Sequence, residues 1–204
     1  MFALVDKSDN SITRMLSGSQ GITLDGIQHP KAIFSLWTEA ERNAINIYTV
    51  EINNSKRKNT EWYVNTNVTY SFNGSKVTGS YGDATARAHA DTLFTAQDES
   101  DGKGTEGDVK DEGLKTKLIR SIKSQAEGEL NKTDWYVVRK AEESTAIPSA
   151  VTTHRKAVRS KQAEMETAIT NASDTPALET LYTYTKQEDG STTRPLGEIP
   201  VKEF

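Results

Sequence analysis

The stretch from residue 130 to residue 159 constrains the fold more than any other, because it joins a short helix and a long helix through a proline. Thr133 is expected to cap the short helix with its side-chain oxygen, and Asp134 adds negative charge at the positive end of the helix dipole. Trp135 and Val138 lie three residues apart on one helical face, so we expect both side chains to pack inward.

The long helix is expected over residues 149–171. The residue before Pro148 is pushed out of the α region, and a proline costs little at a helix start, so the break falls there. Val151, Val158 and Met165 then recur seven residues apart and form a narrow apolar seam. This seam either closes a local core or meets a helix of a partner, and we favour the local core because amphipathic helices usually face their own domain.

A third helix is expected upstream of this pair. Its apolar residues recur every four positions, at Leu114, Leu118, Ile122, Ala126 and Leu130. That spacing predicts an amphipathic helix that packs on the helical hairpin. Residues 114–172 are therefore predicted to form a three-helix module.

The N-terminal residues 1–94 are predicted to form a small β-rich domain. Hairpins are expected around residues 6–11 and over residues 68–81, where Asn73-Gly74 suits a type I′ turn. Residues 21–24, followed by Asp25-Gly26, predict another short strand and a turn. Thr38 and Glu41 have the spacing of a capping box, which predicts a helix near residues 38–43 before a strand at residues 45–50. Another short helix is expected within residues 84–93.

Two segments are predicted to lack a packed core. Residues 95–113 are rich in Asp, Glu and Gly, so we expect a flexible acidic linker; the spacing of Asp98, Glu99 and Asp101 does not match a calcium loop. Residues 173–204 are predicted to be an extended tail that holds at most one helical turn or strand near its start. The expected fold class is α+β.

Composition narrows the classes of function. The net charge of −4 argues against general nucleic-acid binding, and the absence of cysteine excludes thiolate chemistry. We expect no enzyme, because His29, His89 and His154 are scattered and no phosphate loop or nucleophile motif occurs. Catalytic residues, cofactors and metal ligands are accordingly predicted to be none. No apolar segment is long enough for a membrane span, so no membrane partner is expected.

The motif of residues 130–159 resembles the helical module of phage tail assembly chaperones and tail-fibre-assembly proteins. The residues that carry the resemblance are Thr133-Asp134-Trp135, Arg139, Ile147-Pro148, Arg155 and Arg159. A more diffuse similarity to a small upstream domain of phage tail proteins is carried by His29-Pro30, Trp37-Thr38, Glu41-Arg42, Ala44-Ile45 and Ile47-Tyr48. The chain departs from the family at His154, where an aromatic residue, commonly Tyr, is usual.

The resemblance implies a non-enzymatic protein that binds other tail or tail-fibre proteins in the host cytoplasm during assembly. The alternative is a permanent component of the virion tail, and a homo-oligomer is a further partner arrangement. The candidate partner-binding residues are Trp135, Arg139, Pro148, His154, Arg155 and Arg159. For Trp135 we weigh a core position above an interface hot spot, and for the arginines a solvated face competes with bidentate contacts to carboxylates.

Overall fold

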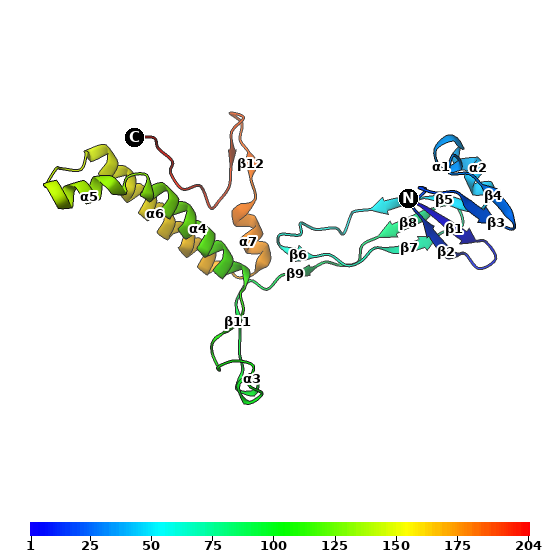
Figure 1. The fold of residues 1–204 in the computed structure, drawn as a ribbon, viewed down its shortest axis with the longest axis horizontal. Coiled ribbons are helices and arrows are strands. Elements are labelled where there is room, and N and C mark those ends of the chain that lie inside the picture. Colours follow the sequence, from blue (N-terminus) through cyan, green and yellow to red (C-terminus); the bar gives the residue numbers. More distant parts are fainter. The chain divides into compact units, whose positions relative to one another are not determined.

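The computed structural model describes residues 1–204 and divides into two compact units, Met1–Thr85 and Ala86–Phe204 (Figure 1). The chain combines a curled sheet with helices and is therefore of the α+β class. The division at residue 85 lies upstream of the boundary after residue 94 that the sequence suggested. The physical reason is that residues 88–91 are hydrogen-bonded to the start of the first long helix, as described below.

Unit 1 is built mainly from short strands. Its elements are β1 (Phe2–Asp6), β2 (Ser11–Leu16), β3 (Ile22–Leu24), β4 (Ile27–His29), α1 (Ile33–Leu36), α2 (Glu39–Ala44), β5 (Ile47–Asn53), β6 (Tyr63–Val64), β7 (Thr69–Phe72), β8 (Val77–Ser80) and β9 (Thr85–Ala86). Five of these strands form one sheet in the order β2-β1-β5-β8-β7, in which β5 and β8 run parallel and the other neighbours run antiparallel.

The central strand β1 supplies side chains to both faces of this sheet, as the alternation of a strand requires. Ala3 and Val5 are buried in one apolar cluster with Tyr48 and Val77. Phe2 and Leu4 point the other way and pack on a second cluster. The buried members of that second cluster come from β2, β3, α1 and β5: Leu16, Ile22, Ile33 and Ile47.

The helix predicted near residues 38–43 is confirmed as α2, and its capping box is complete. The Thr38 hydroxyl accepts a hydrogen bond from the Glu41 amide, while the Glu41 carboxylate accepts one from the Thr38 amide at 2.7 Å. These two bonds satisfy amides that the first helical turn leaves without intrahelical partners. They also hold the pKa of Glu41 below its ordinary value, first through the Thr38 amide and then through its hydroxyl.

The two dipeptides that suggested tight turns behave differently. Asp25-Gly26 joins paired residues Leu24 and Ile27 with φ values of 48° and 80°, the positive values that a type I′ turn requires. The type I′ turn expected at Asn73-Gly74 is wrong, because the pair Phe72↔Val77 encloses a longer loop and only Gly74 has a positive φ. Here the Asn73 side chain accepts hydrogen bonds from the amides of Ser75 and Lys76 and closes the loop itself.

Unit 2 is mainly helical. Its elements are β10 (Thr92–Leu93), α3 (Ala96–Ser100), β11 (Val109–Asp111), α4 (Leu114–Asn131), α5 (Asp134–Glu143), α6 (Ser149–Asn171), α7 (Thr175–Tyr182), β12 (Thr185–Lys186) and β13 (Thr192–Thr193). The three predicted helices are confirmed as α4, α5 and α6, and the bounds of α6 agree with the expected residues 149–171.

The apolar seam of α6 is filled from within the unit. Val151, Val158 and Met165 are all buried, and α6 packs antiparallel along α4, which buries Ile122 and Ala126 (Figure 1). Full burial of an aliphatic side chain of this size stabilises a fold by about 1.5–3 kcal/mol. The expectation of a local core for this seam is therefore confirmed.

The start of α4 is capped by the segment that precedes the arm. The Leu114 and Lys115 amides donate to the carbonyl groups of Ala88 and His89, and the Asp91 carboxylate accepts from the Gly113 amide and the Thr116 hydroxyl, both at 2.7 Å. The hydrogen bond from Thr116, followed by that from Gly113, lowers the pKa of Asp91. The short helix expected within residues 84–93 is wrong, because this stretch is extended and its polar groups bind α4.

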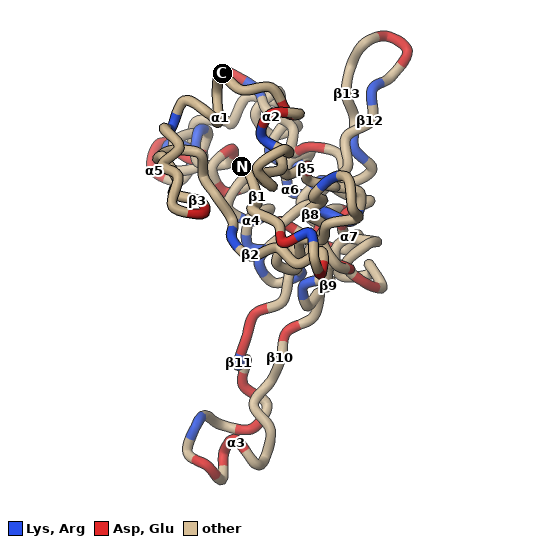
Figure 2. The backbone as a smooth tube through the Cα atoms, turned by 90° about the vertical axis from the view of Figure 1, so that its right-hand side faces the viewer, with Lys and Arg blue, Asp and Glu red and all other residues tan.

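Residues 92–111 form an arm rather than the linker without regular structure that their composition suggested. Strands β10 and β11 pair antiparallel, and α3 lies between them with a capping box made by Thr95 and Asp98. Acidic residues are distributed along the arm (Figure 2), and the Thr95 amide, with Lys110, lowers the pKa of Asp98 to about 2. Local hydrogen bonds and ion pairs, not a core, give this segment its structure, which a hydropathy argument does not detect.

The predicted extended tail, residues 173–204, is also corrected. Residues Thr175–Tyr182 form α7, with Asp174 as N-cap, and β12 and β13 form a hairpin. Beyond the hairpin, Leu196 and Ile199 are 2% and 7% exposed, so this part of the chain contributes to the core of unit 2. Two apolar residues, separated by a glycine and a glutamate and flanked by prolines, are too sparse for a periodic pattern, which explains the wrong prediction.

We predict opposite effects for two glycines, one at the N-cap of α4 and one within it. A Cβ at Gly113 would lie 2.3 Å from the carbonyl carbon of Ala90, so Gly113→Ala should destabilise unit 2 by about 1–3 kcal/mol through overpacking. Gly128 is a helical residue with open space around it, so Gly128→Ala should stabilise by about 0.5–1 kcal/mol. Urea unfolding followed by helical circular dichroism measures both, and equal effects would contradict the role given to residues 88–91.

Candidate interaction surface on helix α5

Arg155, one of the predicted partner-binding residues, is a structural residue. It lies on α6 and is only 9% exposed. Its guanidinium group donates to the Leu130 carbonyl at the end of α4 and to the Thr133 hydroxyl, both at 2.8 Å, and pairs with the Asp134 carboxylate at 2.7 Å. A single buried cation therefore links α6 to the connection between α4 and α5, and its guanidinium group already has partners within the chain.

Thr133 stands at the N-cap of α5 as predicted, but its side chain does not cap the helix. The hydroxyl donates to the Leu130 carbonyl at 2.9 Å and accepts from Arg155. Thr133 is completely buried, and the Arg155 guanidinium competes for the oxygen that would otherwise bind the first-turn amides of α5. The expected capping bond is therefore replaced by a link between three helices.

His154 is buried beside Arg155 and forms a second polar cluster. Its Nε2 lies 2.9 Å from the Glu129 carboxylate, which also accepts from the Lys202 backbone amide at 2.9 Å and from the Lys132 ammonium at 2.8 Å. Burial raises the pKa of Glu129, but the bonds from Lys132, Lys202 and His154 outweigh it, and the pKa lies below its ordinary value. His154 also packs against Phe204, so it binds the C-terminal segment of this chain instead of lying on an open surface.

Helix α5 presents its apolar side chains to solvent. None of its residues is buried, and Trp135, Val137 and Val138 are 51%, 42% and 53% exposed. The preferred interpretation of Trp135 as a core residue, with Val138 packing inward beside it, is wrong. The physical reason is that α6 packs on α4 and α5 lies at the end of this pair (Figure 1), so the face of α5 meets no apolar element.

Arg139 stacks on the exposed rings of Trp135 and Tyr136, and the three side chains form one patch. Its guanidinium carbon lies 4.7 Å from the Trp135 ring centre and 5.4 Å from that of Tyr136, and the two ring centres are 3.7 Å apart. The Arg139 Nε is buried and has no hydrogen-bond partner in the chain. Stacking of this kind holds a cation over an aromatic face at modest energetic gain, about 0.5–1 kcal/mol at exposed sites. We call Trp135, Tyr136, Val137, Val138 and Arg139 the α5 patch.

The two remaining predicted residues, Pro148 and Arg159, do not belong to the α5 patch. Pro148 is exposed and stands at the N-cap of α6, where its φ of −52° suits the helix start. Arg159 is exposed and borders a hollow of about 390 Å³ together with Glu127, Asp134 and Arg155. Of the six predicted residues, the structure thus brings only Trp135 and Arg139 into one exposed patch.

Three residues of this region were not predicted from the sequence: Tyr136 and Val137 of the α5 patch, and Glu129 of α4. Tyr136 and Val137 lie next to Trp135, and a helical projection of residues 134–143 could have shown that apolar residues occupy several faces of a helix too short to bury them. Glu129 was missed because one acid among many gives no indication of burial.

No three His, Asp or Glu side chains lie close enough together to hold a metal ion. None of the helices combines the length and the apolarity needed to cross a lipid bilayer. Comparisons with family models, curated proteins and solved structures gave no match to this chain.

We predict that Arg155 and Arg159 differ sharply in their contribution to stability. Arg155→Met leaves the Leu130 carbonyl and the Thr133 hydroxyl without their charged donor, so the free energy of unfolding should fall by about 2–3 kcal/mol. Arg159→Met removes an exposed side chain and should change it by less than about 0.5 kcal/mol. Denaturant unfolding of both variants is the measurement; a neutral Arg155 variant would contradict the helix-joining role.

Because of Glu129, the free energy of unfolding should depend on pH in the acidic range. A carboxyl group whose folded pKa lies below its ordinary value of 4.5 contributes stability that is present above that value and is lost as the pH falls through the folded pKa. Wild type should therefore exceed Glu129→Gln in unfolding free energy at neutral pH, and the difference should shrink on acidification below about pH 4.5. A difference that stays constant down to strongly acidic pH would argue against the cluster.

Proposed function

We propose that this chain is a non-enzymatic protein-docking factor of a bacteriophage tail, which binds another tail or tail-fibre protein through the α5 patch. The single observation that carries the docking role is the exposure of Trp135, Val137 and Val138 on a helix with no buried residue. Tryptophan and arginine are enriched among the residues that dominate binding energies, and Trp135 and Arg139 are stacked together here. The link to phage tails rests on the sequence resemblance of residues 133–159.

The α5 patch is suited to docking because the bonds that fix the two ends of α5 lie outside the patch. Arg155 and Thr133 fix the start of α5 through buried polar bonds, and at the other end Ser144 closes the helix in a left-handed conformation with a φ of 58°. A partner can therefore cover the apolar side chains without unfolding the helix that presents them. Pre-organisation of this kind lowers the entropic cost of binding.

A second candidate function is that of a permanent component of the virion tail. The observation that favours it is the division into two compact units, since an adaptor needs one surface for each neighbour. Mass spectrometry of purified particles separates the two candidates: stoichiometric presence supports a component, and absence supports a factor that leaves after assembly.

We predict that changes in the α5 patch weaken binding with little loss of stability. Trp135→Ala and Val138→Asp remove or charge exposed side chains, so the free energy of unfolding should change by less than about 1 kcal/mol, while affinity should fall by at least about tenfold because interface hot spots exceed that threshold. The measurement is co-expression with candidate tail and tail-fibre proteins followed by pull-down and titration of any captured partner.

Arg159→Glu serves as the matched control, because it changes an exposed residue of the same helical unit outside the patch. Retained capture by the control and lost capture by the two patch variants would support the proposal. Equal capture by Trp135→Ala and wild type would remove α5 from the interface, and failure of every tail protein to bind wild type would remove the phage assignment.

A further inference from the structure

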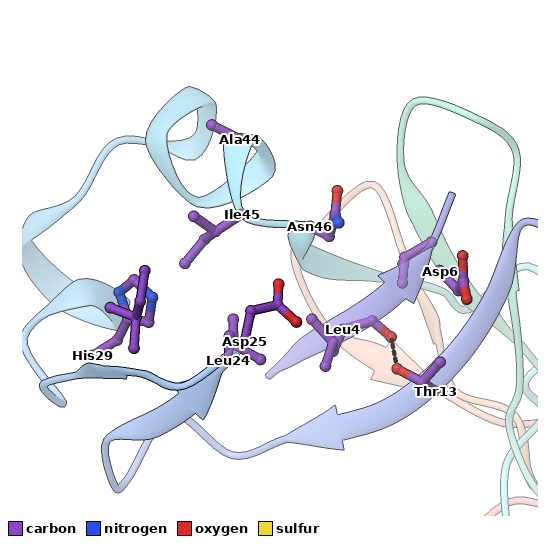
Figure 3. Close-up of a pocket in the computed structure, with 11 residues that line it drawn as sticks. Leu4, Asp6, Thr13, Leu24, Asp25, His29, Ala44, Ile45 and Asn46 are labelled. Carbon is purple, nitrogen blue, oxygen red and sulfur yellow. Dashed lines mark hydrogen bonds between the residues drawn. The ribbon is translucent and has the colours of Figure 1, made fainter. Parts of the chain in front are cut away.

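Unit 1 contains a cavity of about 450 Å³ that the α5 patch does not explain (Figure 3). Its walls come from four places in the chain: the end of β1, the middle of β2, the β3–β4 hairpin and the connection from α2 to β5. The volume lies in the range of ordinary ligand pockets, about 300–1,000 Å³. The cavity therefore has the size and the construction of a binding site for part of another molecule.

The apolar part of the cavity is an extension of the core that remains open. Leu4, Leu24 and Ile45 pack partly on the second apolar cluster and also face the cavity. Ile27 completes the wall and is 63% exposed, which is high for an aliphatic side chain next to a core. Additional apolar groups placed here would remove surface from water at a gain of about 25 cal/mol per Å².

The type I′ turn of the β3–β4 hairpin places a carboxylate at the cavity. Asp25 occupies the first central position of this turn, and its carboxylate is directed toward the space beside Leu4 and Asn46 (Figure 3). The Asp25 side chain makes no hydrogen bond or ion pair within the chain. Asn46, with a φ of 61°, lines the same space, and its side-chain amide has no partner in the chain either.

The charges around the cavity have one sign. Asp6 lies at its edge and accepts hydrogen bonds from the Ser8 hydroxyl and amide, which lower the pKa of Asp6. The lining contains no lysine or arginine, and its histidine, His29, stacks edge-on against Trp37. Two carboxylates that are not neutralised by a cation of the lining favour a positively charged guest.

We propose that this cavity binds the basic side chain of a partner polypeptide, with the aliphatic stem against Leu4, Leu24 and Ile27 and the cationic head at Asp25. A lysine or arginine side chain combines an apolar stem with a terminal cation, which is the combination that these walls require. Asn46 then offers its side-chain oxygen as a second acceptor for the head. The Asp25 carboxylate gains the charge-assisted bonds that it lacks in the free chain.

The full-length protein should be titrated by NMR with three capped tripeptides, in which glycine flanks arginine, lysine or citrulline. Citrulline has the shape of arginine without the charge. Saturable shifts of the lining residues are expected with the arginine and lysine peptides, and binding of the citrulline peptide should be weaker by at least about tenfold. The difference between the arginine and lysine peptides shows which head group the cavity prefers.

Asp25→Asn is the decisive variant, because Asn-Gly also suits a type I′ turn and the hairpin should be retained. It should weaken the arginine peptide by at least about tenfold, whereas Asp189→Asn, which changes the net charge equally in a turn of unit 2, should have no effect. Ile27→Ser should weaken both basic peptides through loss of the apolar wall. Equal binding of arginine and citrulline peptides, equal behaviour of the two Asn variants, or absence of saturable binding would each overturn the proposal.

Discussion

The buried guanidinium group of Arg155 is the interaction on which the arrangement of the helical unit depends. Removing a cation from water is costly unless it is paired and hydrogen-bonded, and here the Leu130 carbonyl, the Thr133 hydroxyl and the Asp134 carboxylate all lie against its Nη1. All three acceptors lie where α4 ends and α5 begins. The buried cation therefore holds the start of α5 against the end of α4, and the charge that is expensive to bury also stabilises this connection.

This constraint explains why α5 can exist without a core of its own. An isolated helix of this length is marginal in water, and burial of an apolar face normally stabilises it. In α5 the polar bonds at its start provide part of that stabilisation, and the stacked rings of Trp135 and Tyr136 with Arg139 add a local contribution. The apolar residues are consequently left available on the surface.

Periodicity predicted the elements whose stability comes from a repeated apolar face. The seam at Val151, Val158 and Met165 predicted α6, Pro148 marked its start, and the capping box at Thr38 located α2. Periodicity failed where single polar groups determine structure. Asp91 caps α4 from outside the helix, and the acidic arm folds through its own hydrogen bonds. A periodic pattern of apolar residues indicates neither of these interactions.

The same limit applies to the candidate partner-binding residues. The sequence motif correctly located the helical hairpin. Four of its six candidate residues nevertheless lie outside the α5 patch. A motif does not distinguish an arginine that faces a partner from one that joins two helices. His154 and Arg155 are adjacent on the inner side of α6, where Glu129 and Leu130 of α4 meet them. Once that inner side is occupied by α4 and by Phe204 of the C-terminal segment, α6 has no apolar seam left for a partner. The apolar side chains of α5 are then the ones in this helical hairpin that remain for a partner to cover, and this is the strongest structural argument for docking at Trp135.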